Sequence, residues 1–167
     1  DLRGREMSMI FQNPRAALNP IRTVEQQIVD VLAAHGRLSR SSARVQALDL
    51  LRAVRIRDPE ARLSAYPHEL SGGMRQRVMI AMAIACDPAL LIADEPTTGL
   101  DVTTQKTVMD LLARLTAERN MGLILITHDL GLAAQYCGDV AVMQDGEVVE
   151  RADAATLFRA PRHPYTQ

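Results

Sequence analysis

Two adjacent carboxylates, Asp94 and Glu95, follow the apolar run of residues 89–93. Carboxylates at the end of a buried strand cost free energy unless they bind a ligand or take part in chemistry. In an open α/β sheet the carboxyl ends of the strands form the ligand-binding edge. There Asp94 can hold Mg²⁺, and Glu95 can accept a proton from a water that attacks a phosphate. A helix cap or a strand-end salt bridge explains such a dipeptide more often, so the interpretation depends on the neighbouring motifs.

A second candidate site is the Ser-Gly-Gly sequence of residues 71–73, which precedes an expected helix over residues 75–86. Ser71 can cap this helix, while Gly72 and Gly73 allow a ligand to approach the backbone closely. The exposed N–H groups and the helix dipole favour an anion such as phosphate. An ordinary capped loop has the same composition, so this motif also needs support from others.

Three single residues complete the candidate set. Gln12 follows an expected strand, and its amide oxygen can reach Mg²⁺ or water. His128 follows the apolar run of residues 123–127 and can donate to a phosphate oxygen or hold a glutamate and water in line. A lone histidine at a strand end is more often structural, and Asp101 by itself is only a helix cap.

The elements that must position these residues are three short strands and one long helix. A strand is expected over residues 7–11, and the apolar runs 89–93 and 123–127 are typical of parallel strands covered on both faces. A helix over residues 102–119, capped by Asp101, connects the last two strands as a crossover.

Between the first two strands the sequence predicts helices. Thr23 and Gln26 form a capping box for one helix, which Gly36 can end. Apolar residues at helical spacing predict a second helix over residues 43–54, with Gln46 facing solvent. Asp58, followed by a proline, is typical of the N-cap of a third helix. Farther along, the apolar segments 140–143 and 147–149 flank an Asp-Gly pair, which predicts a β-hairpin.

Composition limits the classes of function. The 167 residues are 47% hydrophobic, which is enough for one core, and the formal net charge is -1. This balance gives no electrostatic reason to expect nucleic acid or an anionic membrane surface as the main partner. The longest apolar run, residues 78–86, is too short to span a bilayer, so a role at a membrane has to come through partners.

Together these motifs resemble the ATP-binding-cassette (ABC) family in their order along the chain. The matching segments are Gln12 for the Q-loop, residues 70–74 for the signature motif, residues 90–95 for Walker B, residues 99–101 for the D-loop and His128 for the switch histidine. The resemblance implies an α/β P-loop NTPase fold, an ABC ATPase core with an inserted helical subdomain. It divides the chain into a core strand and Q-loop (1–13), a helical subdomain with the signature motif (14–86), an α/β catalytic core (87–150) and the start of a C-terminal extension (151–167).

The resemblance also implies site roles and cofactors, ATP and Mg²⁺. ABC cassettes dimerise head to tail, so Ser71, Gly72 and Gly73 are expected to bind the nucleotide of the partner subunit in trans. The roles expected within the subunit itself are catalysis by Glu95 and His128, Mg²⁺ binding by Asp94 and Gln12, and a place at the dimer seam for Asp101.

A finer resemblance is to the D-type ATPase subunits of oligopeptide, dipeptide and nickel importers. It rests on Phe11-Gln12-Asn13-Pro14, Leu18-Asn19-Pro20, Tyr66-Pro67-His68-Glu69, Met74 and His163-Pro164-Tyr165-Thr166. It implies a subunit that binds and hydrolyses ATP during import of peptides or similar small solutes, peripheral on the cytoplasmic face of the bacterial plasma membrane. The implied partners are a second ABC ATPase, two integral membrane permeases and, indirectly, an extracytoplasmic solute-binding protein, with no nucleic acid.

One departure from the family pattern is serious. The sequence contains no Gly-x-x-x-x-Gly-Lys-Ser/Thr, and its only lysine, Lys106, follows no glycine pattern. That loop supplies much of the phosphate binding. The sequence starts without methionine, so we expect a fragment that is incomplete at the N-terminus and inactive alone, whose full-length parent is a transport-coupled ATPase.

Two other functions stay open at this point. One is an ABC ATPase outside transport, in repair or translation, against which the helical stretch and the importer-like tail argue. The other is a non-catalytic dimerisation module, against which Glu95 and His128 argue.

Overall fold

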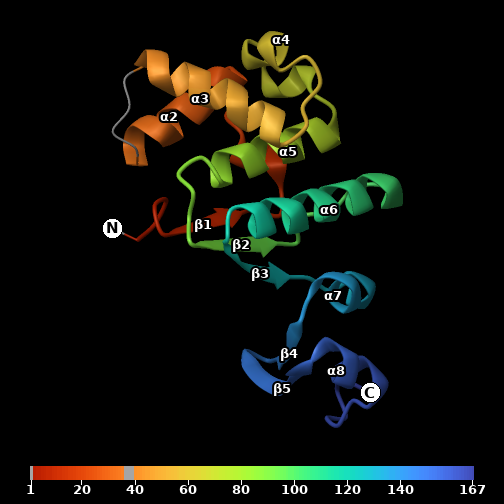
Figure 1. The fold of residues 1–167 in the computed structure, drawn as a ribbon. Coiled ribbons are helices and arrows are strands. Elements are labelled where there is room, and N and C mark those ends of the chain that lie inside the picture. Colours follow the sequence, from red (N-terminus) through yellow and green to blue (C-terminus); the bar gives the residue numbers. More distant parts are fainter. Residues whose placement is uncertain (1, 36–39) are drawn as a thin grey trace. The chain divides into compact units, whose positions relative to one another are not determined.

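The computed structural model describes residues 2–35 and 40–167. These residues form two compact units, Asp1–Ile126 and Thr127–Gln167, each of which is described by itself (Figure 1). The first unit contains β1 (Met7–Ile10), α1 (Pro14–Ala17), α2 (Val24–His35), α3 (Arg40–Ala53), α4 (Pro59–Leu63), a 3₁₀ turn (Pro67–Glu69), α5 (Gly72–Ala83), β2 (Leu90–Asp94), α6 (Val102–Glu118) and β3 (Gly122–Ile126). The second unit contains α7 (Leu130–Tyr136), β4 (Asp139–Gln144), β5 (Glu147–Asp153) and α8 (Ala154–Arg159).

The core of the first unit is a parallel sheet with the order β1-β2-β3. Ile10 pairs with Ala93 in the first ladder, and Asp94 pairs with Ile126 in the second. The three expected strands and the connecting helix are therefore confirmed. Because all three strands run in the same direction, the residues that follow β1 and β2 emerge at one edge of the sheet.

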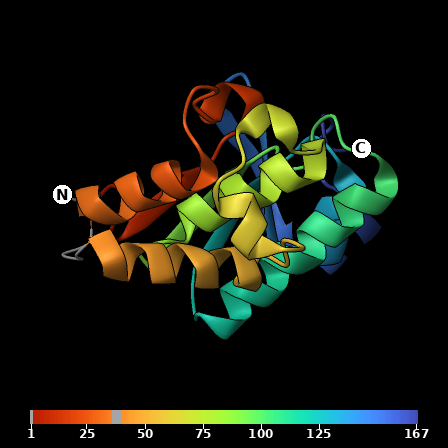
Figure 2. The same ribbon diagram turned by 90° about the horizontal axis from the view of Figure 1, so that it is seen from above.

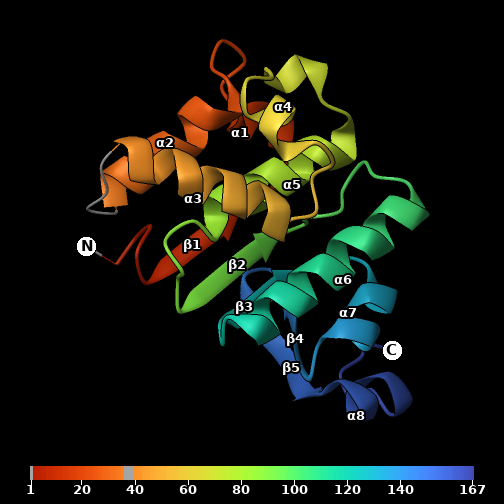
Figure 3. The same cartoon turned by 45° about the horizontal axis from the view of Figure 1, so that its top comes forward.

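The two faces of this sheet differ in burial. Ile10, Leu91 and Ala93 are fully buried, and Figures 1 and 3 show α5 and α6 on one side of the sheet. On β3, however, side chains alternate between half-buried and exposed, and Ile124 and Ile126 are each 48% exposed. The expectation of strands covered on both faces is therefore wrong for β3 in the described structure.

The helices between β1 and β2 form a layer over α5. The predicted capping box of α2 is confirmed, because the Thr23 backbone N–H donates to Gln26 Oε1 at 3.0 Å and the Gln26 N–H donates to Thr23 Oγ1 at 3.3 Å. The predicted stop at Gly36 lies outside the described residues. Figure 2 shows α2 and α3 side by side, and α3 begins at Arg40, earlier than predicted.

The start of α4 differs in detail from its prediction. The helix begins at Pro59, as expected, but Asp58 adopts a left-handed φ of 50° and its side chain makes no capping hydrogen bond. Asp58 is thus the N-cap residue, as predicted, but its side chain does not cap the helix. A residue at a helix N-cap normally has an extended backbone, from which its side chain can turn back to the first helical N–H groups.

The second unit is built on the predicted hairpin of β4 and β5, which is confirmed. Asp145 and Gly146 have φ values of 52° and 85°, and two successive positive φ angles are the signature of the tight I′ turn that suits the twist of paired strands. At the end of the hairpin Asp153 caps α8 by accepting from the Thr156 N–H at 2.9 Å. The division into four parts drawn from the sequence remains a prediction.

Glu150 on β5 holds the C-terminal segment of the second unit. Its carboxylate accepts from the N–H of Arg162 at 2.8 Å and from that of His163 at 3.0 Å. Hydrogen bonds from the backbone N–H groups, that of His163 above all and that of Arg162, hold the pKa of Glu150 below its ordinary value. The charged form of Glu150 is therefore the one that binds the segment.

Glu150→Gln is expected to loosen this segment, because an amide offers one acceptor oxygen where the carboxylate offers two. Hydrogen exchange at Arg162 and His163, corrected for intrinsic rates, should be several-fold faster in the variant at neutral pH. A lowered folded pKa stabilises the bound segment above the unfolded pKa, and this stabilisation is lost as the pH falls through the folded pKa. The exposed Glu147 on the same strand provides the control Glu147→Gln, which should exchange like the parent. Unchanged exchange in the Glu150 variant would show that the carboxylate does not hold the segment.

Candidate active site

The candidate site lies at the carboxyl edge of β1 and β2. Asp94 is the last residue of β2, and Glu95 follows it directly. Gln12 lies two residues beyond the end of β1, and its Nε2 donates to Glu95 Oε2 at 2.7 Å. The structure therefore brings together two residues that are 83 positions apart in the sequence and that were both selected as site residues.

Glu95 has an unusual backbone conformation. Its φ is 43°, in the left-handed region that residues other than glycine rarely adopt. Its N–H donates to the Ile126 carbonyl at 2.9 Å, and its own carbonyl accepts from the Thr98 N–H at 3.1 Å. These bonds turn the chain sharply at the end of β2 and fix the point from which the carboxylate projects. Such conformations are found disproportionately at functional sites.

Thr98 is a site residue that sequence reasoning missed. Its Oγ1 donates to Glu95 Oε2 at 2.8 Å, so this oxygen accepts from both Thr98 and Gln12. A hydroxyl three residues after a carboxylate, with a proline between them, is a common turn composition and gives little warning of such a contact.

The oxygen donors at this edge fit the expected magnesium site. Asp94 offers a half-buried carboxylate. The Gln12 amide donates to Glu95 through its nitrogen, so its oxygen is the atom that could bind the metal. Among the residues that the structure describes, no three His, Cys, Asp or Glu side chains gather into a cluster that could hold a metal by itself. Mg²⁺ is ordinarily held by one or two carboxylates together with substrate phosphates, so a sparse set of oxygen ligands suits it.

The signature segment begins α5 as predicted. Ser71 is the N-cap of this helix, and its Oγ accepts from the Met74 N–H at 3.3 Å. A Cβ added to Gly73 would lie 3.0 Å from Thr104 Cγ2, whereas one on Gly72 would lie 3.8 Å from Leu100 Cδ2. Gly73 therefore has a packing role at the start of α6, which the sequence did not indicate.

Asp101 caps α6, as the sequence predicts. Its Oδ1 accepts from the Thr104 N–H at 3.0 Å, and its Oδ2 accepts from Thr104 Oγ1 at 2.6 Å. These hydrogen bonds hold the pKa of Asp101 below its ordinary value, and the bond from the Thr104 hydroxyl has the largest effect. Asp101 therefore remains charged at neutral pH while it also faces solvent.

His128 belongs to the second unit, where it is exposed between Thr127 and Asp129. The Asp129 N–H donates to Thr127 Oγ1 at 3.0 Å, and Asp129 Oδ1 accepts from the Leu132 N–H at 3.1 Å to cap α7. The backbone around His128 is thus held by its two neighbours. The expected catalytic role of His128 rests on the sequence alone.

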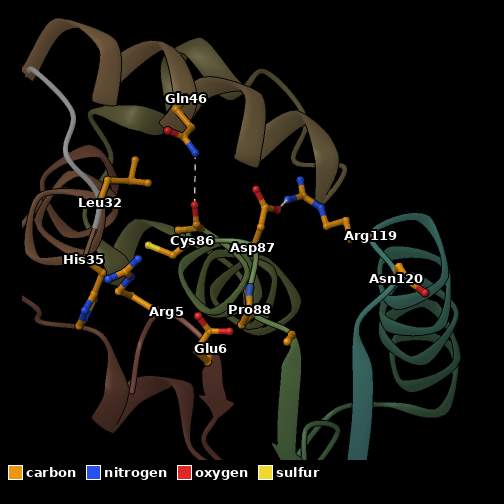
Figure 4. Close-up of a pocket in the computed structure, with 12 residues that line it drawn as sticks. Arg5, Glu6, Leu32, His35, Gln46, Cys86, Asp87, Pro88, Arg119 and Asn120 are labelled. Atoms are coloured by element: carbon orange, nitrogen blue, oxygen red, sulfur yellow. Dashed lines mark hydrogen bonds and ion pairs between the residues drawn. The ribbon is translucent and has the colours of Figure 1, made fainter. Parts of the chain in front are cut away.

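A pocket at the other edge of the sheet contains none of the predicted site residues (Figure 4). Its wall includes Gln46, whose Nε2 donates to the Ala85 carbonyl at 3.2 Å, so the prediction that Gln46 faces solvent is wrong. An ion pair joins Arg119 and Asp87 beside it. Burial and the charge of Asp87 raise the pKa of the Cys86 thiol, which makes this cysteine a poor nucleophile at neutral pH.

Comparison with known proteins identifies the family of this chain. A family model described as ABC transporter matches residues 1–98. The chain belongs to this family. Within the ABC transporter family, the dipeptide transport ATP-binding protein DppD of Escherichia coli is 56% identical over 167 residues, which are 100% of this chain and 51% of DppD. A probable peptide ABC transporter ATP-binding protein of Sinorhizobium fredii is 53% identical over 100% of this chain and 50% of its own length.

Solved structures show the same cassette fold. A dimeric ATP-binding cassette bound to ADP and phosphate superimposes with a TM-score of 0.77 at 29% identity, over 90% of this chain and 64% of the other. The cbiO1 component of the transporter complex cbiONQ from Clostridium perfringens gives 0.80 at 30% identity, over 93% and 60%. The chain thus has the fold of an ABC ATPase cassette, and it spans about half the length of the curated relatives it matches.

Proposed function

We propose that this chain is part of a subunit that binds and hydrolyses ATP in an ABC importer of peptides or similar small solutes. The observation that carries the proposal is the contact of Gln12 with Glu95 beside Asp94 at the carboxyl edge of the sheet. This arrangement supports the proposal, because the proposed metal ligands and proton acceptor lie at the edge where nucleotides bind in such folds.

Each site residue has a distinct part in the proposed reaction. Asp94 and Gln12 would hold Mg²⁺, which neutralises charge on the phosphates when it is bound. Glu95 orients the attacking water and accepts its proton, and His128 helps to hold that geometry.

The remaining predicted residues act between subunits. Ser71, Gly72 and Gly73, at the N-terminus of α5, contact the nucleotide that the partner subunit holds. Asp101, charged and exposed at the start of α6, lies at the seam of the two subunits.

The similarity to known importers supports the proposed substrate class. Besides the dipeptide and peptide proteins, the glutathione import ATP-binding protein GsiA of Escherichia coli is 52% identical over 99% of this chain and 27% of its own length. These named solutes are short peptides. No helix in the described part of the chain is long and apolar enough to cross a bilayer. The proposed partners are a second ABC ATPase, two integral membrane permeases and, indirectly, an extracytoplasmic solute-binding protein. The subunit itself would be peripheral on the cytoplasmic face of the bacterial plasma membrane.

Reconstitution into proteoliposomes tests this function. The full-length subunit, assembled with these partners, should accumulate a labelled dipeptide inside the vesicles only with ATP and Mg²⁺. Removal of Mg²⁺ with EDTA should stop both hydrolysis and uptake, and added Mg²⁺ should restore them. Hydrolysis without uptake of any short peptide would contradict the proposed import, and failure to hydrolyse ATP would contradict the proposed enzyme.

A further inference from the structure

One oxygen of Glu95 accepts two hydrogen bonds that come from different parts of the fold. Gln12 approaches Oε2 at 2.7 Å from the end of β1, and Thr98 approaches it at 2.8 Å from the turn that follows β2. The chain therefore holds the two donors beside Glu95 in different ways, one through a neighbouring strand and one through a short turn.

Thr98 is tied to Glu95 by the backbone as well as by its side chain. The Thr98 N–H donates to the Glu95 carbonyl at 3.1 Å, which closes a turn over residues 95–98. Pro96 and Thr97, the central residues of this turn, are buried. Proline also fixes one backbone dihedral of the turn. The Thr98 hydroxyl is thus held in place with respect to the carboxylate by a short and rigid stretch of chain.

Gln12 is attached differently. It is exposed and lies beyond the end of β1, and its hydrogen bond to Glu95 joins the end of β1 to the end of β2. In the proposed function the Gln12 amide also binds Mg²⁺ through its oxygen, so the position of its nitrogen beside Glu95 depends on the metal and the nucleotide. The donor in the turn, by contrast, can accompany Glu95 through the whole reaction.

We propose that Thr98 is a positioning residue, whose hydroxyl keeps the Glu95 carboxylate in its working orientation when Gln12 turns to the metal and nucleotide. This inference rests on the proposed ATPase function. A glutamate has three rotatable side-chain bonds, and a general base must lie within hydrogen-bond reach of the water that it activates. A displacement of about 1 Å can cost roughly 10²-fold in rate, so one hydrogen bond that removes this freedom matters for turnover.

The test compares Thr98→Val, which keeps the shape and removes the hydroxyl, with Thr98→Ser, which keeps the hydroxyl. In the full-length subunit assembled with its partners, Thr98→Val should lower kcat for ATP hydrolysis about tenfold. This is the order expected for the loss of one hydrogen bond to a charged group. KM and nucleotide affinity should stay within about twofold, because the hydroxyl acts on the base and not on the nucleotide. Thr98→Ser should restore kcat to within about twofold of the parent.

A control and a double variant separate positioning from other effects. Thr107→Val also loses a hydroxyl hydrogen bond, to the Thr103 carbonyl of α6 at 2.8 Å, and should leave kcat unchanged. In a Glu95→Gln background Thr98→Val should have no further effect, because the hydroxyl acts through that carboxylate.

Three outcomes would overturn the inference. They are a Thr98→Val variant with the parental kcat, a serine variant as slow as the valine variant, and a loss that persists in full without Glu95. If the parent hydrolyses ATP and Glu95→Gln abolishes this activity, such an outcome rejects the role of Thr98 alone. A parent without hydrolysis rejects the proposed function itself and this inference with it.

Discussion

Glu95→Gln in the full-length, assembled subunit is expected to slow ATP hydrolysis at its own site by about 10² to 10⁴-fold, the usual loss when a general base is removed. Nucleotide affinity should change little, because Asp94 and Gln12, which are proposed to hold the metal, remain. The amide is nearly the same size as the carboxylate and keeps one acceptor oxygen for Thr98 and Gln12. The geometry of the turn should therefore persist while the ability to take a proton is lost.

Single-turnover hydrolysis and nucleotide binding, measured separately, check this expectation. Glu118→Gln is a matched control, since it makes the same chemical change at an exposed residue that pairs with Arg114 on α6. That pair is a surface ion pair, so its loss should leave hydrolysis unaffected. If Glu95→Gln kept hydrolysis within about twofold of the parent, Glu95 would not be the catalytic base. If it abolished nucleotide binding instead, its role would be structural or in metal binding.

Much of the frame around this glutamate follows from patterns in the sequence. Apolar runs that end in polar residues predict parallel strands over residues 89–93 and 123–127, whose carboxyl ends form one edge of a sheet. The structure adds β1 to this sheet, and the hydrogen bond of Gln12 with Glu95 lies at that edge. The capping residues Thr23, Ser71 and Asp101 were also found correctly, because a cap is a local interaction between residues close in sequence.

What the sequence did not predict depends on conformation or on contacts between elements. A positive φ at Glu95 has no compositional signal, because glycine, asparagine and aspartate are the residues that normally mark it. The contact of Thr98 with Glu95 follows from that turn. The close approach of Gly73 to Thr104 depends on how α5 meets α6, and a Ser-Gly-Gly sequence suits a ligand equally well.

The missing side-chain hydrogen bond at Asp58 has a related cause. Asp-Pro is a common helix start, but the same aspartate tolerates the left-handed conformation and can serve as a turn residue instead. Asp101 and Asp58 are both N-cap aspartates, but only Asp101 accepts a capping hydrogen bond. The difference lies in the backbone that leads into each helix, extended at Asp101 with φ of -68° and left-handed at Asp58.

Ser71→Arg tests the proposed action in trans and is the second change from which we expect a large effect. Ser71 is exposed at the N-terminus of α5, the end of a helix that an anion can approach. Arginine fills this approach and removes the helix cap, at a cost of about 0.5 to 2 kcal/mol in stability. We expect the partner ATPase's site to lose hydrolysis almost completely, while the subunit's own site, built on Asp94 and Glu95, continues to work.

Pairing the change with Glu95→Gln allows the two sites to be resolved. In that background only the partner's site can turn over, so adding Ser71→Arg should remove the remaining single-turnover hydrolysis. Ser64→Arg places the same side chain on another exposed serine of the helical layer, where the hydroxyl bonds the Ala61 carbonyl at 3.1 Å, and should leave that activity intact. If Ser71→Arg alone silenced the subunit's own site and spared the partner's, the signature segment would act in cis. In that case the N-terminus of α5 would have to serve the nucleotide beside Glu95, and the assignment of Asp101 to the seam between subunits would lose its basis.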